Sequence, residues 1–401
     1  MAVYIVIFCL VSFCSVWFDG LRRSPSWKGK WLVYWGLCLV LTLVAALRFR
    51  LGVDTIRFGH DYSLIHPLAQ LSAADFRIEN YDPGYVLLAS LLRSITPSFL
   101  LMQAVCAVFI NFTLFRFFRQ STSRPFLAVW IYLVAYFLPF NMEIMRASIA
   151  IGLFLLAWPS FRSRRWWLYY LLTFAATLMH FSAFILLFLP ILRNPFFRAL
   201  FRPGWPAFIC AAAMLVIGWV LAEYWTEIFA PLGRVYWRFI QVVDDYKTFN
   251  FVGCQLNWKG IAGLLTFVVL YPVAAIFLSR KPRPLLDLLT MCWIYITIIS
   301  INIPVFGRFA VFFIPAAIAL VSDWAFSPWR KGTGLGDRPG PVFWLVYAAL
   351  FMGWQARQLY SVYEPMHMRV YQTYVPYSSV LNPFEDPDRE EIFELIFPFE
   401  R

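Results

Sequence analysis

The chain has 401 residues, of which 61% are hydrophobic, 20% are aromatic and only 14% are charged, and its formal net charge is +12. Globular domains carry about 25% charged residues, so this composition excludes an ordinary soluble enzyme. The basic residues lie in short segments between apolar runs. This distribution indicates membrane topology and argues against nucleic acid as a partner.

Apolar runs of helix length recur along the chain. A run of roughly 20 apolar residues matches the thickness of the bilayer's hydrocarbon core, and inside lipid such a run forms a helix. The sequence therefore predicts an all-α polytopic membrane protein with roughly 10–12 transmembrane helices. We expect helices at 2–18, 31–47, 98–115, 126–140, 144–159, 206–222, 259–278, 285–302, 309–326 and 341–360. The first lacks a basic start and a cleavage site, so we expect it to be retained rather than removed as a signal peptide.

The charges of the connecting segments predict an orientation. Six short connections are rich in arginine and lysine, and the positive-inside rule places them in the cytoplasm. Loops 48–97 and 223–258 have mixed charge and the tail 361–401 is acidic, so we expect all three outside. A single transmembrane domain is then expected over residues 1–360. Residues 81–95 form a shorter, Arg93-bearing segment that predicts an amphipathic helix on the outer surface.

Residues 166–190 are apolar but have basic segments on both sides. A single crossing places one basic segment outside, whereas a bent hairpin keeps both inside. We favour the hairpin, with its turn near His180 and Ser182, and the single crossing stays open.

Ionisable side chains lie at outer helix ends in four places, namely the segment 47–62 (Arg48, Arg50, Asp54, Arg57, Asp61), the segment Asn141–Arg146, His180 and Arg308. Such groups are costly within a membrane and are usually functional. Structural alternatives are an ion-pair ladder for Asp54, Arg57 and Asp61, headgroup contact for Arg48 and Arg50, pairing of Glu143 with Arg146, an interior role for His180 and a helix-end contact for Arg308. The convergence of all four places on one face favours a site.

Arginines in such a site suit phosphate or diphosphate, which guanidinium binds with two parallel hydrogen bonds. A nearby carboxylate or imidazole can take a proton from an attacking hydroxyl. These groups predict a substrate with an anionic head and an apolar tail. The 42 phenylalanines, 18 tryptophans and 20 tyrosines can contact such a tail and stack on sugars.

In these residues the chain resembles the EpsG family of Wzy-like polysaccharide polymerases of capsule, exopolysaccharide and O-antigen synthesis. The matching motifs are Arg48-x-x-x-Gly52-x-Asp54, Asp82-Pro83-Gly84-Tyr85, Met142–Ala150, His180-Phe-Ser182-Ala183 and Arg308, and they span roughly residues 30–320. The chain departs from the family at Asp82, where Glu is usual, at Ala147, where Gln is frequent, and at Phe58, where Tyr is common.

The resemblance implies an enzyme of the bacterial inner membrane, similar to GT-C-type glycosyltransferases, with its site facing the periplasm. It would join oligosaccharide repeat units carried on undecaprenyl diphosphate, which serve as both donor and acceptor. We expect diphosphate contacts from Arg48, Arg146 and Arg308, a base in Asp54 or His180, and substrate contacts from Asp82, Tyr85 and Glu143. The sequence shows no metal-ligand spacing, and we expect no metal and no other cofactor.

The bilayer, a chain-length regulator and a flippase of the same pathway are the expected partners. Two alternatives stay open, a lipid-linked oligosaccharide flippase and an O-antigen ligase-like glycosyltransferase. A flippase needs charges deep in a central cavity rather than at outer helix ends. A ligase usually has a large outer loop late in the chain, and the longest loop here is mid-chain.

Overall fold

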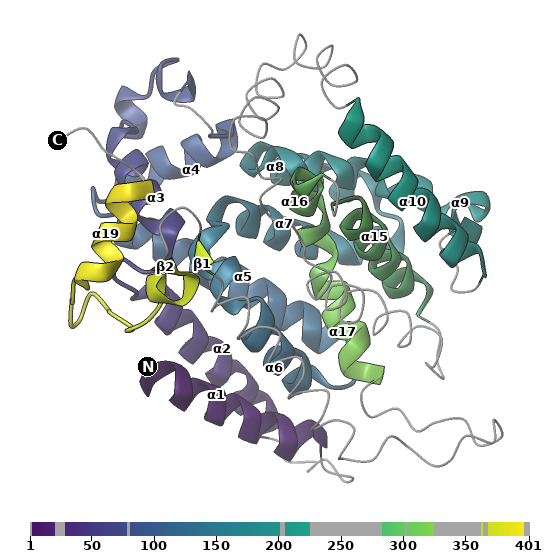
Figure 1. The fold of residues 1–401 in the computed structure, drawn as a ribbon, viewed down its shortest axis with the longest axis horizontal. Coiled ribbons are helices and arrows are strands. Elements are labelled where there is room, and N and C mark those ends of the chain that lie inside the picture. The colour runs from purple at the N-terminus through teal and green to yellow at the C-terminus, as the bar shows by residue number, and fades with distance from the viewer. Residues whose placement is uncertain are drawn as a thin grey trace. The chain divides into compact units, whose positions relative to one another are not determined.

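The computed structural model describes residues 2–20, 29–77, 81–200, 205–224, 283–300, 303–324, 362–363 and 368–396. The chain divides into two compact units, one of Met1–Phe181 with Gly336–Arg401 and one of Ser182–Leu335. Helices dominate both units, which confirms the predicted helical class for the described residues (Figure 1). Two short antiparallel strands near the C-terminal end, β1 (Val362–Tyr363) and β2 (Met368–Arg369), were not predicted.

Six apolar helices form the core of the first unit. They are α1 (Ala2–Ser15), α2 (Lys30–Ala46), α5 (Phe99–Ser121), α6 (Pro125–Ala135), α7 (Met145–Ser163) and α8 (Trp166–Met179). Helix α2 packs on α5, α5 on α7, α7 on α8, and α1 on α6. Apolar residues also cover faces that point away from this core, such as Val6 on α1 and Trp167 on α8. Helices that are apolar all round are typical of membrane proteins.

The predicted helix ends differ from the observed ones where the chain enters a π-helical turn. Helix α1 continues into such a turn, η1 (Val16–Gly20), and α6 stops at Ala135 before another, η4 (Pro139–Glu143). The prediction of helix through residue 140 was wrong because Pro139 has no N–H to donate to an α-helical ladder. Helix α5 runs on to Ser121, six residues beyond the predicted end at 115.

Buried polar contacts fix the helices against one another. Asn111 of α5, Tyr132 of α6 and Asn141 of η4 form a closed triangle of hydrogen bonds of 2.8, 2.9 and 2.7 Å. At the other end of α6, the carboxylate of Asp19 accepts from the backbone N–H groups of Phe126 and Leu127. A buried polar group without a partner costs free energy, so these contacts specify one packing.

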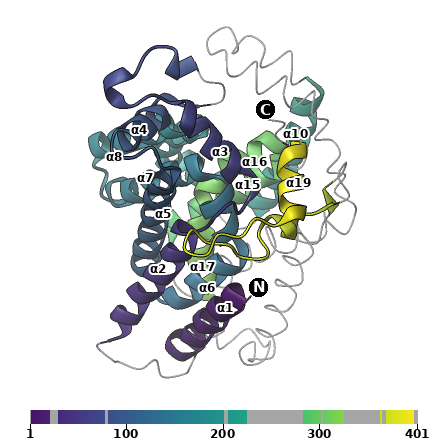
Figure 2. The ribbon, with the colours of Figure 1, turned by 90° about the vertical axis from the view of Figure 1, so that its left-hand side faces the viewer.

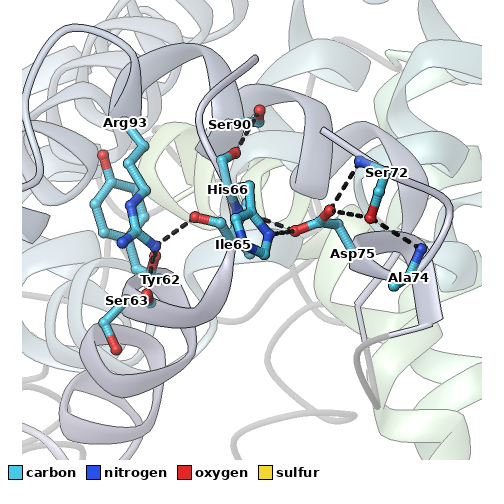
Figure 3. A network of polar contacts seen from close by, with 9 residues as sticks. All are labelled: Tyr62, Ser63, Ile65, His66, Ser72, Ala74, Asp75, Ser90 and Arg93. Carbon is cyan, nitrogen blue, oxygen red and sulfur yellow. Dashed lines mark hydrogen bonds and ion pairs between the residues drawn. The ribbon is translucent and has the colours of Figure 1, made fainter. Parts of the chain in front are cut away.

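The segment between α2 and α5 contains α3 (Val53–Leu64), the short 3-10 turns η2 (Leu68–Gln70) and η3 (Asp75–Arg77), and α4 (Pro83–Arg93). The predicted helix at 81–95 is therefore confirmed as α4. The Arg93 guanidinium of α4 bonds to the carbonyl oxygens of Tyr62, Ser63 and Ile65, at the end of α3 (Figure 3). This contact satisfies carbonyls that a helix end leaves without partners.

The predicted break within 166–190 is present. Helix α8 ends at Met179, His180 has extended backbone angles, and a 3-10 helix, η5 (Phe181–Arg193), follows. The boundary between the two units falls directly after Phe181. The hairpin itself stays a prediction for that reason.

The second unit is built around α15 (Pro284–Ser300). It packs against α10 (Trp205–Glu223) and against α16 (Gly307–Ala310) and α17 (Ile314–Trp324), and α9 (Pro195–Leu200) contacts α10. The 3-10 turns η8 (Pro304–Phe306) and η9 (Val311–Phe313) flank α16. Helix α10 confirms the prediction at 206–222, and α15 confirms that at 285–302 up to its end at Ser300. The described part of the predicted helix at 309–326 is helical but divided into α16, η9 and α17. The predicted helices at 259–278 and 341–360, and residues 225–258 of the predicted loop 223–258, lie outside the described residues.

By length and apolar composition, two helices among the described residues are able to cross a membrane, Ala2–Gly20 and Phe99–Ser121. Six shorter apolar helices accompany them, at Lys30–Ala46, Pro125–Ala135, Trp166–Met179, Phe181–Arg193, Ile209–Leu221 and Pro284–Ser300. The number of crossings stays a prediction.

The C-terminal segment belongs to the first unit. It contains η10 (Val370–Thr373) and α19 (Pro387–Ile396), drawn in yellow in Figure 2. Its residues contact the stretch that joins α2 to α3, as Phe49 N–H donates to the carbonyl oxygen of Ser378 at 2.9 Å. The tail that the sequence marked only as acidic is thus packed against the predicted outer loop.

Candidate functional site

Asp82, Arg146 and His180 come together from three separate helix ends of the first unit. Asp82 directly precedes α4, Arg146 lies in the first turn of α7, and His180 directly follows α8. Oδ2 of Asp82 lies 4.0 Å from a guanidinium nitrogen of Arg146 and 3.8 Å from Nδ1 of His180. It also accepts a hydrogen bond from the Phe181 N–H at 3.3 Å. The carboxylate of Asp82, the guanidinium of Arg146 and the imidazole of His180 therefore lie close together.

The motif Asp82-Pro83-Gly84-Tyr85 forms this meeting point because α4 and α8 approach closely there. Pro83 occupies the first turn of α4, where its missing N–H costs nothing. A Cβ atom on Gly84 would lie 2.8 Å from the carbonyl oxygen of Leu178. Only glycine permits this approach, which brings the start of α4 to the end of α8.

The guanidinium of Arg146 lies over two aromatic rings. Its carbon is 4.8 Å from the ring centre of Tyr81 and 5.8 Å from that of Phe58. Tyr81 in turn stacks on Tyr85, with ring centres 5.1 Å apart, and donates a hydrogen bond to Asp61. Cation–π contact holds the guanidinium plane without consuming its N–H donors. With 21% of its side chain exposed, Arg146 is accessible to a ligand.

Tyr85, predicted to contact substrate, is almost completely buried beneath Tyr81. Its hydroxyl has no hydrogen-bond partner among the described residues. The Tyr85 ring stacks on Tyr81, one of the two rings that contact the Arg146 guanidinium, and its role in substrate contact stays a prediction.

Arg48 is turned into the protein instead of outward. Only 1% of its surface is exposed, and its guanidinium donates to the carbonyl oxygen of Ala45 at 2.6 Å, to Met145 Sδ at 3.3 Å and to Thr55 Oγ1 at 3.5 Å. Burial lowers the pKa of Arg48 to about 10, so it stays cationic at neutral pH. It ties the end of α2 to the starts of α3 and α7.

Glu143 caps the N-terminus of α3. Its two carboxylate oxygens accept from the N–H groups of Val53 at 3.2 Å and Asp54 at 3.1 Å, and the hydroxyl of Tyr374 donates a third hydrogen bond. The helix dipole favours a carboxylate at this position. Burial, followed by the neighbouring charge of Asp54, raises the pKa of Glu143 above its ordinary range. Among the described residues, Glu143 contacts Val53, Asp54 and Tyr374 and forms no ion pair with Arg146, the pairing that the sequence offered as an alternative.

Gly52 makes the approach of Glu143 possible. Its φ is +85°, a conformation that favours glycine, and a Cβ atom there would lie 2.8 Å from Oε1 of Glu143. The motif Arg48-x-x-x-Gly52-x-Asp54 thus describes a turn that is closed by Glu143. Asp54, a candidate base, lies in the first turn of α3 with its backbone N–H held by this cap.

Two alternatives for the remaining arginines can be compared with the structure. Arg57 pairs with Asp61 at 3.7 Å, as the ladder interpretation expects. Arg50 pairs with Glu390 of α19 rather than extending to headgroups. Arg308 lies in α16 and therefore in the second unit, so its convergence with Arg146 stays a prediction. Within the described part of the chain, no three His, Cys, Asp or Glu side chains gather as a metal site does.

The model of the EpsG family matches residues 31–379. The chain belongs to the EpsG family. Its members are Wzy-like polysaccharide polymerases, and membership points to a polymerase-type glycosyltransferase. Together with the apolar helices it also points to a membrane protein. No curated protein and no solved structure matches the chain.

The family match covers every motif that the sequence marked, and it also reaches Tyr374, which the sequence analysis missed. Arg389 and Glu390 lie beyond the match but pack in the same place. One signal was present in the sequence, since Arg389 is a lone cation in the acidic stretch of the tail around it. A lone charge of opposite sign in such a stretch indicates a specific partner.

Proposed function

We propose that the chain is a membrane glycosyltransferase that polymerises oligosaccharide repeat units carried on undecaprenyl diphosphate, at the periplasmic face of the bacterial inner membrane. Membership of the EpsG family supports the polymerase class. The observation that carries the proposal is the meeting of Asp82, Arg146 and His180 at adjoining helix ends. A base and an anion-binding cation at one place are what transfer from a diphosphate requires.

His180 is the proposed base. A carboxylate facing Nδ1 favours the tautomer that carries its proton there, in which Nε2 is unprotonated and can act as a base. The acceptor hydroxyl gives its proton to Nε2 as its oxygen forms a bond to the anomeric carbon of the donor. The bond from that carbon to the diphosphate oxygen breaks, and the leaving diphosphate takes the electron pair. Asp54 is the second candidate for the base.

Arg146 is the proposed ligand of the diphosphate. Its seat on Tyr81 and Phe58 fixes the guanidinium plane, so little side-chain entropy remains to be lost on binding. Developing charge on the leaving diphosphate is stabilised by a cation that is already in place. The carboxylate of Asp82 lies 4.0 Å from the guanidinium, which is beyond hydrogen-bond distance.

Arg48 has a different proposed role from the one its motif suggested. Its donors are engaged by Ala45, Met145 and Thr55, and its surface is buried. We therefore assign Arg48 to positioning the starts of α3 and α7, which carry Asp54 and Arg146. Arg308 stays a proposed diphosphate ligand on its sequence position alone.

Reconstitution tests the proposal directly. Purified protein in liposomes is given a lipid-linked repeat unit, and products are resolved as a ladder of increasing length. We expect wild type and Arg57→Ala to form a ladder, and Arg146→Ala and His180→Ala to lose it while remaining folded. Arg57 is the matched control because it is an outer arginine whose partner is Asp61.

Other outcomes separate the alternatives. Movement of the lipid-linked unit across the bilayer without joining identifies a flippase. A single transfer to a lipid A core acceptor, with no ladder, identifies a ligase-like enzyme. Either result overturns the proposed polymerase.

A further inference from the structure

Residues 368–396, which we call the C-terminal clasp, pair with the stretch between α2 and α3 through backbone hydrogen bonds. The Val380 N–H donates to the carbonyl oxygen of Leu47 at 2.9 Å, and the Gly52 N–H donates to that of Thr373 at 3.0 Å. Arg48 and Ser379 also form an isolated antiparallel bridge. The clasp therefore lies along the whole turn that precedes α3, and Figure 1 shows α19 beside α3.

A buried arginine gives the clasp its shape. Arg389 has no exposed surface, and its guanidinium donates to the carbonyl oxygens of Pro376 at 2.6 Å, Arg50 at 3.3 Å and Gln372 at 3.4 Å. Two of these acceptors lie in the clasp and one lies in the stretch it covers. Beside it, Arg50 Nε donates to Glu390 at 2.9 Å. Arg389 and Glu390 thereby fix the clasp both to itself and to the stretch between α2 and α3.

Tyr374 is the clasp residue that reaches the site. Its hydroxyl donates to Oε1 of Glu143, the oxygen that also accepts from the Val53 N–H. Its carbonyl oxygen accepts from the Tyr4 hydroxyl of α1 at 3.0 Å. Tyr374 is therefore held by Tyr4 through its backbone, while its hydroxyl fixes the Glu143 carboxylate that caps α3.

The orientation of α3 matters because this helix also carries part of the Arg146 seat. Phe58 of α3 is one of the two rings under the guanidinium, and Asp61 of α3 accepts from the hydroxyl of Tyr81, the other ring. A rotation of α3 about its N-terminus would displace both rings. The position of Arg146 thus depends on the cap made by Glu143.

We propose that the C-terminal clasp is a working part of the outer-face site, in which Tyr374 is a positioning residue that holds Glu143 on α3 and so holds Arg146 in place for a diphosphate. This inference rests on the proposed function for the identity of the ligand. Tyr374 itself makes no contact with substrate in this assignment. Its contribution is to the binding of the diphosphate group.

The test compares two tyrosines of the clasp. Tyr374→Phe removes only the hydroxyl that donates to Glu143. Tyr377→Phe removes a hydroxyl that donates to the carbonyl oxygen of Val44 at 2.9 Å, with no contact to Glu143. Each full-length variant is assayed for polymer formation and, separately, titrated with a short-chain polyprenyl diphosphate. Loss of a charge-assisted hydrogen bond should raise KM for the donor and Kd for the diphosphate about tenfold in Tyr374→Phe. The kcat should stay near that of wild type.

Tyr377→Phe should keep the wild-type KM and Kd. Equal KM and Kd for the two variants overturns the inference, because a merely structural phenol would lower the yield of folded protein without changing the affinity of what remains. If Tyr374→Phe does not accumulate, Glu143→Gln tests the cap that Tyr374 is proposed to hold, since either orientation of its amide turns the N–H₂ group toward the backbone N–H of Val53 or of Asp54. A wild type that forms no ladder overturns the proposed function instead, and the diphosphate titration then still decides the inference.

Discussion

The carboxylate of Asp82 faces both Nδ1 of His180 at 3.8 Å and, with the same oxygen, the guanidinium of Arg146 at 4.0 Å. One acidic side chain thus sets the orientation of the proposed base and of the proposed diphosphate ligand. The same oxygen accepts from the Phe181 N–H, which fixes it at the end of α8. Separate substitutions of Asp82 and its neighbours should therefore affect different kinetic constants.

Asp82→Asn should reduce kcat about a hundredfold, the scale of general base catalysis, with a smaller change in KM. The amide oxygen can still accept from Phe181, but the negative charge opposite His180 is gone. The measurement is the initial rate of ladder formation by purified protein. Asp388→Asn, which changes an exposed carboxylate of α19, is the control. Equal rates for the two variants would remove Asp82 from the mechanism.

Gly84→Ala should destabilise the first unit by about 1–3 kcal/mol, the usual cost of forcing extra volume into a packed contact. The new Cβ would lie 2.8 Å from the carbonyl oxygen of Leu178 and push α4 away from α8. Thermal unfolding in detergent measures the loss, and polymer formation should fall with it. Gly36→Ala is the matched control, because nothing lies within 4 Å of its added atom and alanine favours the helix. A Gly84→Ala protein as stable as Gly36→Ala would contradict the packing argument.

The helices could be predicted from sequence because the bilayer sets the length of an apolar run. Helix ends were predicted less well, since Pro139 and the π-helical turn after α6 are decided by local backbone bonding. The break at His180 was found from the basic segments on both sides of 166–190, which made a straight crossing unfavourable. The distribution of charged residues therefore predicted this break, which the pattern of apolar residues alone does not indicate.

The site could be predicted in outline but not in its assignments. Sequence placed Asp82, Arg146 and His180 on one face, and the structure brings their side chains together. The sequence could not show that Arg48 turns inward. An arginine that follows a helix end can point to solvent or back to the helix carbonyls, and its position in the sequence is the same in both cases. Nor could the sequence pair Tyr374 with Glu143 across 231 residues, a contact that leaves no local pattern.

Asp75 should make the outer segment sensitive to acid. Its carboxylate, shown in Figure 3, accepts from the backbone N–H groups of His66 and Ser72 at 2.9 Å and contacts their side chains at 2.8 Å. Burial acts to raise the pKa of Asp75, but these contacts outweigh it and hold the pKa well below its ordinary value of 3.8. Because the folded state binds this proton less readily than the unfolded state, the stabilisation is complete above the ordinary pKa. It is lost as the pH falls from there through the folded pKa.

The comparison of wild type with Asp75→Asn measures this effect. The difference in thermal stability should be largest near pH 6 and should shrink progressively below about pH 4. Ser72→Ala, which removes one of the donors, should give a smaller difference with the same pH trend. A difference between wild type and Asp75→Asn that is constant from pH 6 to pH 3 would show that the carboxylate charge is not what stabilises the turn.

Arg389→Ala should be the most destabilising single change in the C-terminal clasp, by about 3 kcal/mol, because it removes a fully buried guanidinium and leaves the part-buried carbonyl oxygens of Pro376, Arg50 and Gln372 without their donor. Glu390→Ala is the matched control one residue away. Its partner Arg50 and Glu390 itself keep 35% and 24% of their side chains exposed, so the loss should be at most about 1 kcal/mol.

The destabilisation by Arg389→Lys should lie between those by Arg389→Ala and Glu390→Ala, since a single ammonium cannot reach three carbonyl oxygens arranged for a guanidinium fork. Proteolysis gives a local measure to set beside thermal unfolding, because Leu381 in the clasp is 79% exposed and marks an accessible loop. Cleavage there should become faster in Arg389→Ala and stay slow in Glu390→Ala. If both variants were cleaved and unfolded alike, the clasp would be held by the exposed ion pair, and the buried guanidinium would not be the group that fixes it.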